Sequence, residues 1–260
     1  MCSRRAGASP ASTMLRIVWA VGAALAAARS SAQSPSDIHA WLEKADEARS
    51  AFPAALIRAR ATHIENGAVT GTADFDIYVK GRDRALIVFR GGKNDGRKAL
   101  TVGDRMWLII PGAENPVPIT QNQRLMGGAS FGDVARMRLA EDFTAATRPG
   151  TERVGDRECM VLDLTATSPK APYPRLTLWL DAAPDKLPRK LRFFLPSGKA
   201  AREVVFTRFR KVGGKDVVSE MEIRDLLGPT AAAVTRLEYL DIRPAKIDDA
   251  IFTPEGAKAM

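Results

Sequence analysis

Hydrophobic and polar residues alternate along most of the chain with a period of two. Between residues 73 and 80, for example, Phe75, Ile77 and Val79 alternate with Asp74 and Asp76. Such alternation is typical of a strand that is buried on one face. It recurs around 160–164, 175–181 and 234–242. Turn-forming clusters separate the runs, and they lie at 65–67, 93–96, 111–112, 148–150, 196–198 and 213–214.

Two segments break this pattern and favour helices. After Ser34 and Pro35, a candidate N-cap and first helical residue, Ile38, Leu42 and Ala45 recur with helical spacing. Trp41 belongs to the same apolar stripe. The alternation also stops between residues 121 and 141, where 130–133 is typical of a capping box and 131–139 of a short helix. Gly127-Gly128, just before it, predicts a sharp bend or a close backbone approach.

The predicted strands and helices together indicate a mainly β fold. We expect about 10–11 antiparallel strands, because few connections are long enough for crossover helices. A sheet of that length curls instead of staying flat. The N-terminal helix and the short inserted helix would then cover the concave face of a half-open barrel.

Certain strands are apolar on both faces. In the run 106–110, Met106 and Leu108 point one way while Trp107 and Ile109 point the other. The run 191–195 has the same character. Either the outer face of these strands is covered, by the chain itself or by a dimer contact, or the apolar surface binds a ligand.

The N-terminus has the features of an export signal. Residues 1–32 contain basic residues and no acid, an apolar run from Ile17 to Ala28, and the small residues Ser30-Ser31-Ala32. This combination predicts a cleaved signal peptide over 1–32, followed by a single domain over 33–260. The alternative is an uncleaved anchor, although the apolar run is short for a membrane span.

Cleavage would change the charge and the cysteine count. Four arginines lie in residues 1–32, so the formal net charge would fall from +9 to +5. Such a moderately basic surface is compatible with anionic membranes, and no basic run with interleaved aromatic residues indicates nucleic-acid binding. Cys159 would be the single remaining cysteine, which excludes an internal disulfide and favours a buried, inert thiol.

The sequence contains little that indicates catalysis. Its two histidines, His39 and His63, have no metal-ligand spacing, and no nucleophile-elbow or phosphate-loop motif is present. Most acidic residues occupy the polar positions of strands, as Asp74 and Asp76 do. We therefore expect no catalytic residues, no metal and no cofactor, although a pair of acids distant in the chain is not detectable in this way.

Three stretches resemble one known family. Residues 100–111, with Gly103-Asp104, Trp107 and Pro111, resemble a hairpin of the periplasmic lipoprotein carrier LolA and its relatives. Residues 124–131 resemble a segment of a LolA-like branch of outer-membrane lipoprotein-sorting proteins, and 251–256 resemble the end of that family. Each motif is weak alone, but their order and the predicted export make the set more specific.

The resemblance implies a half-open β-barrel with a hydrophobic cavity that takes up acyl chains. It also implies an arginine, after the second strand, that holds a lid closed. Arg82 is the candidate here, and a solvated turn charge is the alternative. The predicted lining of the cavity combines strand residues with the inserted segment: Phe75, Ile77, Trp107, Ile109, Leu178 and Phe193, with Leu125, Met126 and Phe131. A register error would exchange the two faces of a strand.

Three functions remain open at this stage. The first, implied by the resemblance, is a periplasmic carrier of lipoprotein or lipid acyl chains toward the outer membrane, with protein partners in the two membranes and no nucleic-acid partner. The second is a lipid-binding sensor or scaffold domain of the envelope. The third is an exported hydrolase with dispersed catalytic residues, for which His63 or paired acids would lie at the base of a cleft.

Overall fold

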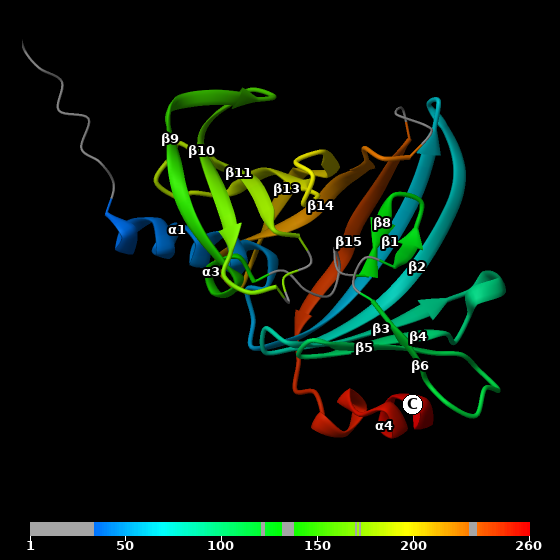
Figure 1. The fold of residues 1–260 in the computed structure, drawn as a ribbon. Coiled ribbons are helices and arrows are strands. Elements are labelled where there is room, and N and C mark those ends of the chain that lie inside the picture. The colour runs from blue at the N-terminus through cyan, green and yellow to red at the C-terminus, as the bar shows by residue number, and fades with distance from the viewer. Residues whose placement is uncertain (1–33, 121–122, 132–137, 170, 172, 229–232) are drawn as a thin grey trace, which may run out of the picture. The chain divides into compact units, whose positions relative to one another are not determined.

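One long antiparallel sheet dominates the chain (Figure 1). The computed structural model describes residues 34–120, 123–131, 138–169, 171, 173–228 and 233–260. The predicted signal peptide over 1–32 lies outside these residues.

The strands are β1 (Ala54–Glu65), β2 (Ala68–Lys80), β3 (Arg84–Arg90), β4 (Lys98–Val102), β5 (Arg105–Ile109), β6 (Val117–Ile119), β7 (Arg124–Met126), β8 (Ala129–Ser130), β9 (Phe143–Val154), β10 (Arg157–Ala166), β11 (Arg175–Asp181), β12 (Pro188–Phe194), β13 (Ala200–Val212), β14 (Lys215–Asp225) and β15 (Val234–Pro244). The helices are α1 (Pro35–Arg49), η1 (Gly92–Asn94), α3 (Leu139–Asp142), η2 (Asp249–Phe252) and α4 (Pro254–Ala259).

The sheet consists of two meanders joined by their first and last strands. Its order is β6-β5-β4-β3-β2-β1-β15-β14-β13-β12-β11-β10-β9, so β1 pairs with β15 at the junction. Strands β6 and β9 are the two edges, and the sheet stays open. The predicted mainly β, half-open antiparallel fold is confirmed. Within the described residues the sheet has thirteen strands, more than the expected 10–11, because short strands such as β6 carry little alternation.

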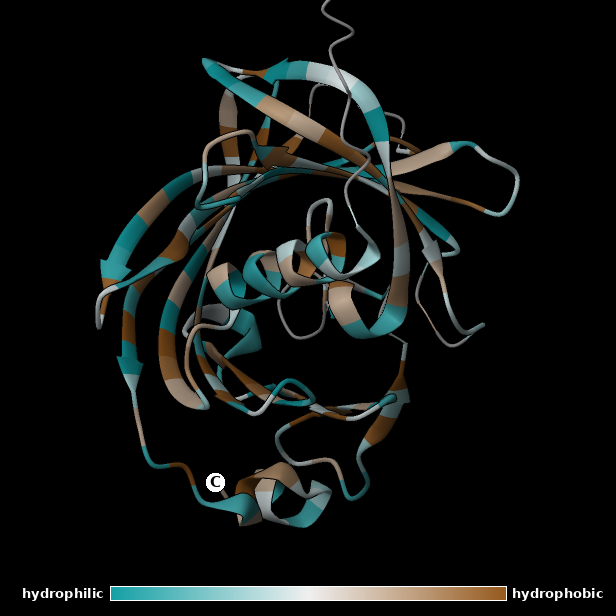
Figure 2. Cartoon of the chain, turned by 90° about the vertical axis from the view of Figure 1, so that its left-hand side faces the viewer, coloured by the Kyte–Doolittle hydropathy of each residue, from teal (hydrophilic) through white to brown (hydrophobic). Residues whose placement is uncertain are grey.

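Helix α1 forms as its sequence predicts. The Ser34 hydroxyl accepts a hydrogen bond from the Asp37 amide at 3.2 Å, and the Ser34 amide donates to the Asp37 carboxylate at 3.3 Å. This reciprocal capping box satisfies two amides at the helix start. Ile38, Leu42 and Ala45 are buried, and Figure 2 shows α1 lying across the concave side of the sheet.

The turn between β1 and β2 fixes the register of the longest hairpin. Asn66 and Gly67 have φ angles of 51° and 80°, the positive values that a two-residue hairpin turn requires. Phe75 thereby lies opposite Ala59, and Ile77 opposite Ile57. The register places the apolar set of both strands on one face.

The turn predicted at 148–150 is wrong. These residues belong to β9, where Thr147 lies opposite Leu162 and Thr151 opposite Met160, so three residues of β9 face one of β10. Gly150, with φ of 79°, permits this bulge. Strand β9 is a sheet edge, where bulges interrupt the pairing that a flat edge would invite.

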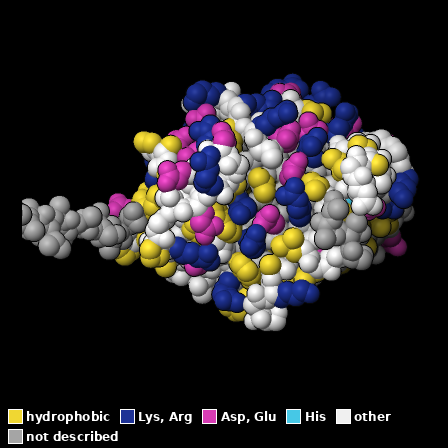
Figure 3. Space-filling model, turned by 90° about the horizontal axis from the view of Figure 1, so that it is seen from above, with side chains coloured by type: hydrophobic (Ala, Val, Ile, Leu, Met, Phe, Trp, Pro, Cys, Tyr) yellow, Lys and Arg dark blue, Asp and Glu magenta, His cyan; other side chains and the backbone are white. Residues whose placement is uncertain are grey.

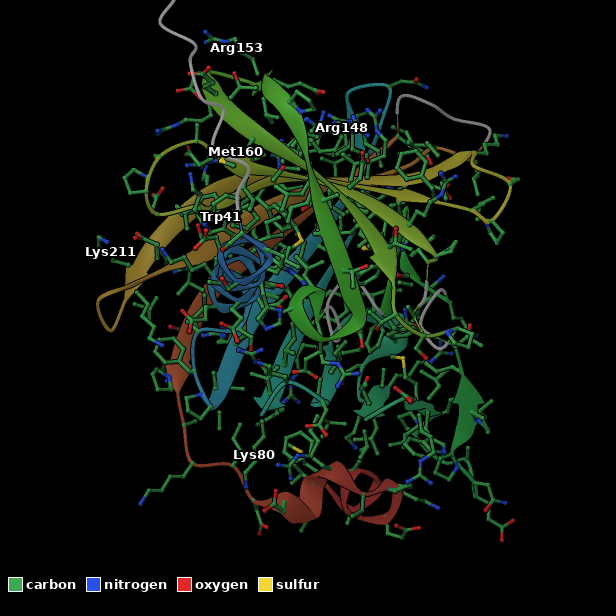
Figure 4. All side chains as sticks on the ribbon, turned by 60° about the vertical axis from the view of Figure 1, so that its left-hand side comes forward. Trp41, Lys80, Arg148, Arg153, Met160 and Lys211 are labelled. Atoms are coloured by element: carbon green, nitrogen blue, oxygen red, sulfur yellow. The ribbon has the colours of Figure 1, made fainter. Side chains whose placement is uncertain are left out.

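The sheet has an apolar core on each face. On the concave face, α1, α3 and the β7–β8 hairpin pack against the main core. On the convex face, Phe252 and Ala257 of η2 and α4 pack against β3, β4 and β5 (Figure 1). The C-terminal segment is also tied to the sheet by Lys80, whose ammonium contacts Asp249 at 2.8 Å and donates to the Ile247 carbonyl at 2.9 Å (Figure 4).

The two helices of the predicted fold class are present: the N-terminal helix is α1 and the short helix is α3. The inserted helix predicted over 131–139 falls largely on residues 132–137, which lie outside the described residues. Of the helices that the structure describes, none combines the length and the apolar character needed to cross a bilayer.

Candidate functional site

The concave face of the sheet carries the candidate binding surface. Phe75, Ile77, Leu178 and Phe193 from the predicted lining are all at most 3 % exposed and belong to one core cluster. Phe131, which follows β8, joins the same cluster at 4 % exposed. These five predicted residues therefore belong to one buried apolar cluster on the concave side.

Aromatic rings connect the sheet to the segment that covers it. The rings of Phe75 and Phe89 lie edge to face with centroids 5.0 Å apart, and Phe89 lies 6.4 Å from Phe131. Phe75 and Phe89 are register partners on β2 and β3. Leu125 and Met126 of β7, also in the predicted lining, are half-buried against the same cluster.

Trp107 and Ile109 lie on the opposite face, and their assignment to the cavity is corrected. Ile109 belongs to the convex core with Phe252, and Trp107 packs against that core. Their neighbours Met106 and Leu108 face the concave side instead. Strand β5 is apolar on both faces because η2 and α4 cover its outer face, which is one of the alternatives that the pattern left open.

We call α1, α3 and the β7–β8 hairpin the lids, because each covers the concave face without belonging to the long sheet. Asp46 joins two of them. Its carboxylate, on α1, accepts hydrogen bonds from the Leu139 and Ala140 amides at the start of α3, at 2.9 and 3.0 Å. Burial raises the pKa of the Asp46 carboxyl above its ordinary value, although the two amide hydrogen bonds act in the opposite direction. Sequence reasoning missed this residue.

Polar contacts hold the β7–β8 hairpin on β1 and β15. The Gly128 amide donates to the Thr235 hydroxyl of β15 at 2.9 Å, and His63 of β1 lies 3.2 Å from the same hydroxyl. Gly127 has φ of 52°, and a Cβ there would lie 2.2 Å from the His63 ring. The predicted bend and close approach at Gly127-Gly128 are both confirmed.

The same contacts argue against a catalytic His63. Its Nε2 lies 2.9 Å from the Glu65 carboxylate and its Nδ1 contacts Thr235, an order that superficially resembles a catalytic triad. Thr235, however, is 0 % exposed and lies beneath the Gly128 backbone. In this arrangement the hairpin covers the hydroxyl and is hydrogen-bonded to it, so the group serves as a structural contact. Among the described residues no cluster of potential metal ligands occurs.

A second buried contact holds the hairpin from the other side. The Arg202 guanidinium of β13 donates to the Ser130 hydroxyl at 2.7 Å, and both residues are buried. The sequence gives a weak signal for it, since Arg202 occupies the same strand face as Val204 and Phe206, which are apolar and buried. Its partner, 72 residues away, is not readable from any local pattern.

Arg82 lies in the turn between β2 and β3, beside a lid. Its guanidinium is 3.7 Å from the Glu141 carboxylate on α3, and the two side chains are 42 % and 46 % exposed. An ion pair this exposed is worth at most about 1 kcal/mol. Arg82 and Asp46 also line a small hollow of about 60 Å³, which is too small for an acyl chain.

Trp41 lies where α1 contacts the meander formed by β9–β15. The Lys186 ammonium lies 5.3 Å from the Trp41 ring centroid and 3.3 Å from the Met160 sulfur. Figure 4 shows Trp41 and Met160 on the same part of the molecule. The contact is partly exposed and non-directional, so it stabilises α1 on the sheet without locking it.

A larger hollow, which we call the rim hollow, lies beside the β7–β8 hairpin. Its volume is about 720 Å³. Phe89, Leu125 and Met126 are its large apolar side chains, and the remainder of the lining consists of polar and charged side chains, glycines and Ala73. Its full lining is Arg60, Thr70, Gly71, Thr72, Ala73, Asp74, Phe89, Arg90, Gly91, Gly92, Lys93, Asn94, Leu125 and Met126. Two of the predicted cavity residues, Leu125 and Met126, thus line a hollow large enough for a small organic ligand.

Charges on the convex surface pair across strands. Arg148 forms two hydrogen bonds to the Asp163 carboxylate, at 2.6 and 2.7 Å, and these bonds hold the pKa of Asp163 below its ordinary value despite some burial. Seen from above, basic, acidic and hydrophobic side chains are interspersed (Figure 3). On this face the basic side chains alternate with acidic ones and do not gather into one patch.

Solved structures with this fold come from several bacteria. A LolA superfamily protein from Nitrosomonas europaea is 23 % identical, with a TM-score of 0.74 over 83 % of this chain and 97 % of that chain. A DUF1329 family protein from Desulfovibrio piger is 19 % identical, with a TM-score of 0.72 over 86 % and 99 %. An outer membrane lipoprotein-sorting protein domain from Vibrio parahaemolyticus is 14 % identical, with a TM-score of 0.72 over 86 % and 100 %.

These likenesses establish the fold, and the sequence adds the family. No curated protein matches the chain. A family model described as an uncharacterized protein matches residues 81–256. The match spans most of the described domain, from the turn before β3 to the first turn of α4. The chain therefore belongs to this family of uncharacterized proteins and has the LolA-like fold.

Proposed function

We propose that the protein is a carrier that binds acyl chains of lipids or lipoproteins between the concave face and the lids. One observation carries the proposal: the apolar concave face is covered by separate elements, two helices and a two-stranded hairpin, instead of a second long sheet. Phe75, Phe89 and Phe131 lie where these elements meet the sheet. An acyl chain can replace lid contacts there without breaking a strand ladder.

The energetics of burial favour reversible binding. Each methylene removed from water stabilises a complex by about 0.8 kcal/mol. Displacing the lids exposes apolar side chains of the protein, which offsets part of that gain. Apolar contacts are non-directional, so chains of different length and branching are accepted. Such a balance suits a protein that must both take up and release its cargo.

The proposal includes a place of action and partners. The predicted signal peptide and the LolA-like fold support a periplasmic protein that moves its cargo toward the outer membrane. A carrier of this kind receives acyl chains from a protein of the inner membrane and delivers them to one of the outer membrane. No chemistry is required of it, so we propose a binding protein and not an enzyme.

The test compares two half-buried apolar residues on opposite faces of the sheet. Met126→Asp places a charge in the wall of the rim hollow, whereas Trp107→Asp places one on the convex face beneath α4. Binding of a fluorescent palmitate analogue to the purified protein should weaken at least about tenfold in Met126→Asp, since a buried charge is costly. Trp107→Asp should retain the wild-type affinity.

Circular dichroism would first establish that both variants are folded. Equal affinities of the two folded variants would contradict the proposed binding face. A wild-type protein that takes up neither the palmitate analogue nor phospholipid from vesicles would contradict acyl binding altogether.

A further inference from the structure

Strand β2 extends past the end of its neighbour β3. Pairing between them begins at Asp74 and Arg90 and continues toward Lys80 and Arg84. Residues 68–73 pair with β1 on one side, and on the other side no strand among the described residues pairs with them. Figure 1 shows β2 continuing beyond β3. Although β2 is an inner strand of the sheet, its residues 68–73 therefore form a free strand edge.

The rim hollow runs along this free edge. Five consecutive residues, Thr70–Asp74, line it, and so do the residues of the segment 89–94. An extended peptide rises about 3.4 Å per residue, so this stretch of β2 matches a strand of about five residues. A hollow of about 720 Å³ has room for a peptide and not merely for an ion.

The features that usually protect a strand edge are weak here. Edges are commonly blocked by lysine, proline or a covering loop, but residues 68–73 contain neither lysine nor proline. The bulge in the register lies at Thr70, so Gly71–Ala73 remain regularly paired with β1. Across the hollow, a Cβ added at Gly91 or Gly92 would meet nothing within 4 Å. On β2 itself, a Cβ added at Gly71 would lie 3.2 Å from the terminal methyl of Met126, so the hairpin side chain contacts this strand. The glycines leave room on the other side of the hollow for an incoming strand.

The charge of the lining indicates which peptides would fit. Arg60, Arg90 and Lys93 line the rim hollow together with a single acidic residue, Asp74. The two arginines pair with Asp74 and Asp76 at 2.7 Å, whereas the Lys93 side chain is exposed. The excess of positive charge favours a ligand that carries acidic side chains.

We propose that the free edge of β2 binds an extended, acidic peptide segment by strand addition. The inference rests on the proposed function and deepens it: the peptide is the chain adjoining the acylated residue of a lipoprotein. The acyl chain would contact Leu125 and Met126, while the peptide backbone pairs with β2. The cargo would then be an acylated protein, recognised at both parts, and not a free lipid.

Three probes that share one palmitoyl chain test this inference. The first carries a hexapeptide of alternating valine and threonine with an aspartate at each end. The second is the same peptide with every backbone amide N-methylated, which removes the donors of a strand. The third replaces the peptide with an ethylene glycol chain of equal length ending in a phosphate. The first probe should bind at least about tenfold tighter than the other two, because strand addition depends on main-chain hydrogen bonds.

A charge variant adds a second readout. Lys93→Glu removes the excess positive charge of the rim hollow and should weaken the first probe several-fold, while Lys199→Glu, on the exposed turn between β12 and β13, should not. Equal binding of the three probes to the wild type would overturn the peptide site and leave acyl binding intact. Tight binding of the phosphate probe alone would assign the rim hollow to a lipid headgroup. Failure of all three would contradict the proposed function itself.

Discussion

At the residue scale, two glycines and a threonine decide how the β7–β8 hairpin lies on the sheet. Gly127 supplies a left-handed backbone next to the His63 ring, and Gly128 brings its amide to the Thr235 hydroxyl. The Gly-Gly pair was readable as a bend. Its partners were not, because His63 and Thr235 are 172 residues apart in the sequence. They become neighbours only when β1 pairs with β15.

Substitution of Gly127 should therefore lower the free energy of unfolding by more than the strain of its positive φ angle alone would. Gly127→Ala adds a Cβ that would lie 2.2 Å from His63 Nδ1 and 2.4 Å from Thr235 Oγ1. We expect a loss of about 2–4 kcal/mol in the free energy of unfolding, from strain and the displaced hairpin, measured by urea denaturation. The control is Gly155→Ala, where φ is 60° and nothing lies within 4 Å, with an expected cost of about 1 kcal/mol. Equal costs would show that the close approach is relaxed in solution.

At the element scale, η2 and α4 explain why β5 is apolar on both faces. Phe252 is 4 % exposed, and the Arg84 guanidinium lies 5.7 Å from its ring centroid. The end of the chain was recognised in the sequence as a family feature, but its packing partner was not. A strand that is apolar on both faces indicates that both are covered, and does not indicate which face is covered by what.

Phe252→Ala should destabilise the protein without changing the ligand surface. Truncating a buried phenylalanine typically costs about 3–5 kcal/mol, and we expect this loss in thermal or urea unfolding. Phe194→Ala, a half-buried phenylalanine beside Arg175, should cost less. Affinity for the palmitate analogue should remain that of the wild type under conditions where the variant is folded. A large fall in that affinity would mean that the convex core shapes the concave face.

At the scale of the whole molecule, an open curled sheet leaves its concave face to be covered by elements outside the sheet, α1, α3 and the β7–β8 hairpin. The hairpin is held to the sheet by hydrogen bonds to Thr235 and Arg202 and by apolar packing against the core, and α3 is hydrogen-bonded to Asp46 of α1. If acyl chains enter beneath the hairpin, its displacement from the sheet limits uptake.

A reversible cross-link tests this displacement. A Cβ at Gly128 would lie 3.4 Å from the Asp225 Cβ, close to the usual separation of about 3.5–4.5 Å in disulfides. In the double variant Gly128→Cys/Asp225→Cys, oxidation should slow uptake of the palmitate analogue at least about tenfold, and reduction should restore it. Each single variant serves as a control that oxidation leaves unchanged. Uptake that is equally fast in both redox states would show that the hairpin need not move.

What the sequence determined by itself is mostly local. Alternation with a period of two identified the strands, the cluster at 65–67 the turn of the longest hairpin, and the candidate N-cap Ser34 the start of α1. Each depends on residues only a few positions apart, so the pattern carries the information. The same reasoning failed at 148–150, because a Pro-Gly pair favours a turn and an edge bulge equally well.

Only the tertiary structure decided which face of each strand is concave and what covers it. Side-chain direction alternates along a strand, so the pattern sorts residues into two sets without saying which set faces inward. That choice placed Phe75 and Leu178 beneath the lids and Trp107 and Ile109 beneath α4. The rim hollow likewise arises from the unequal lengths of β2 and β3 and the packing of a distant hairpin, which no local pattern encodes.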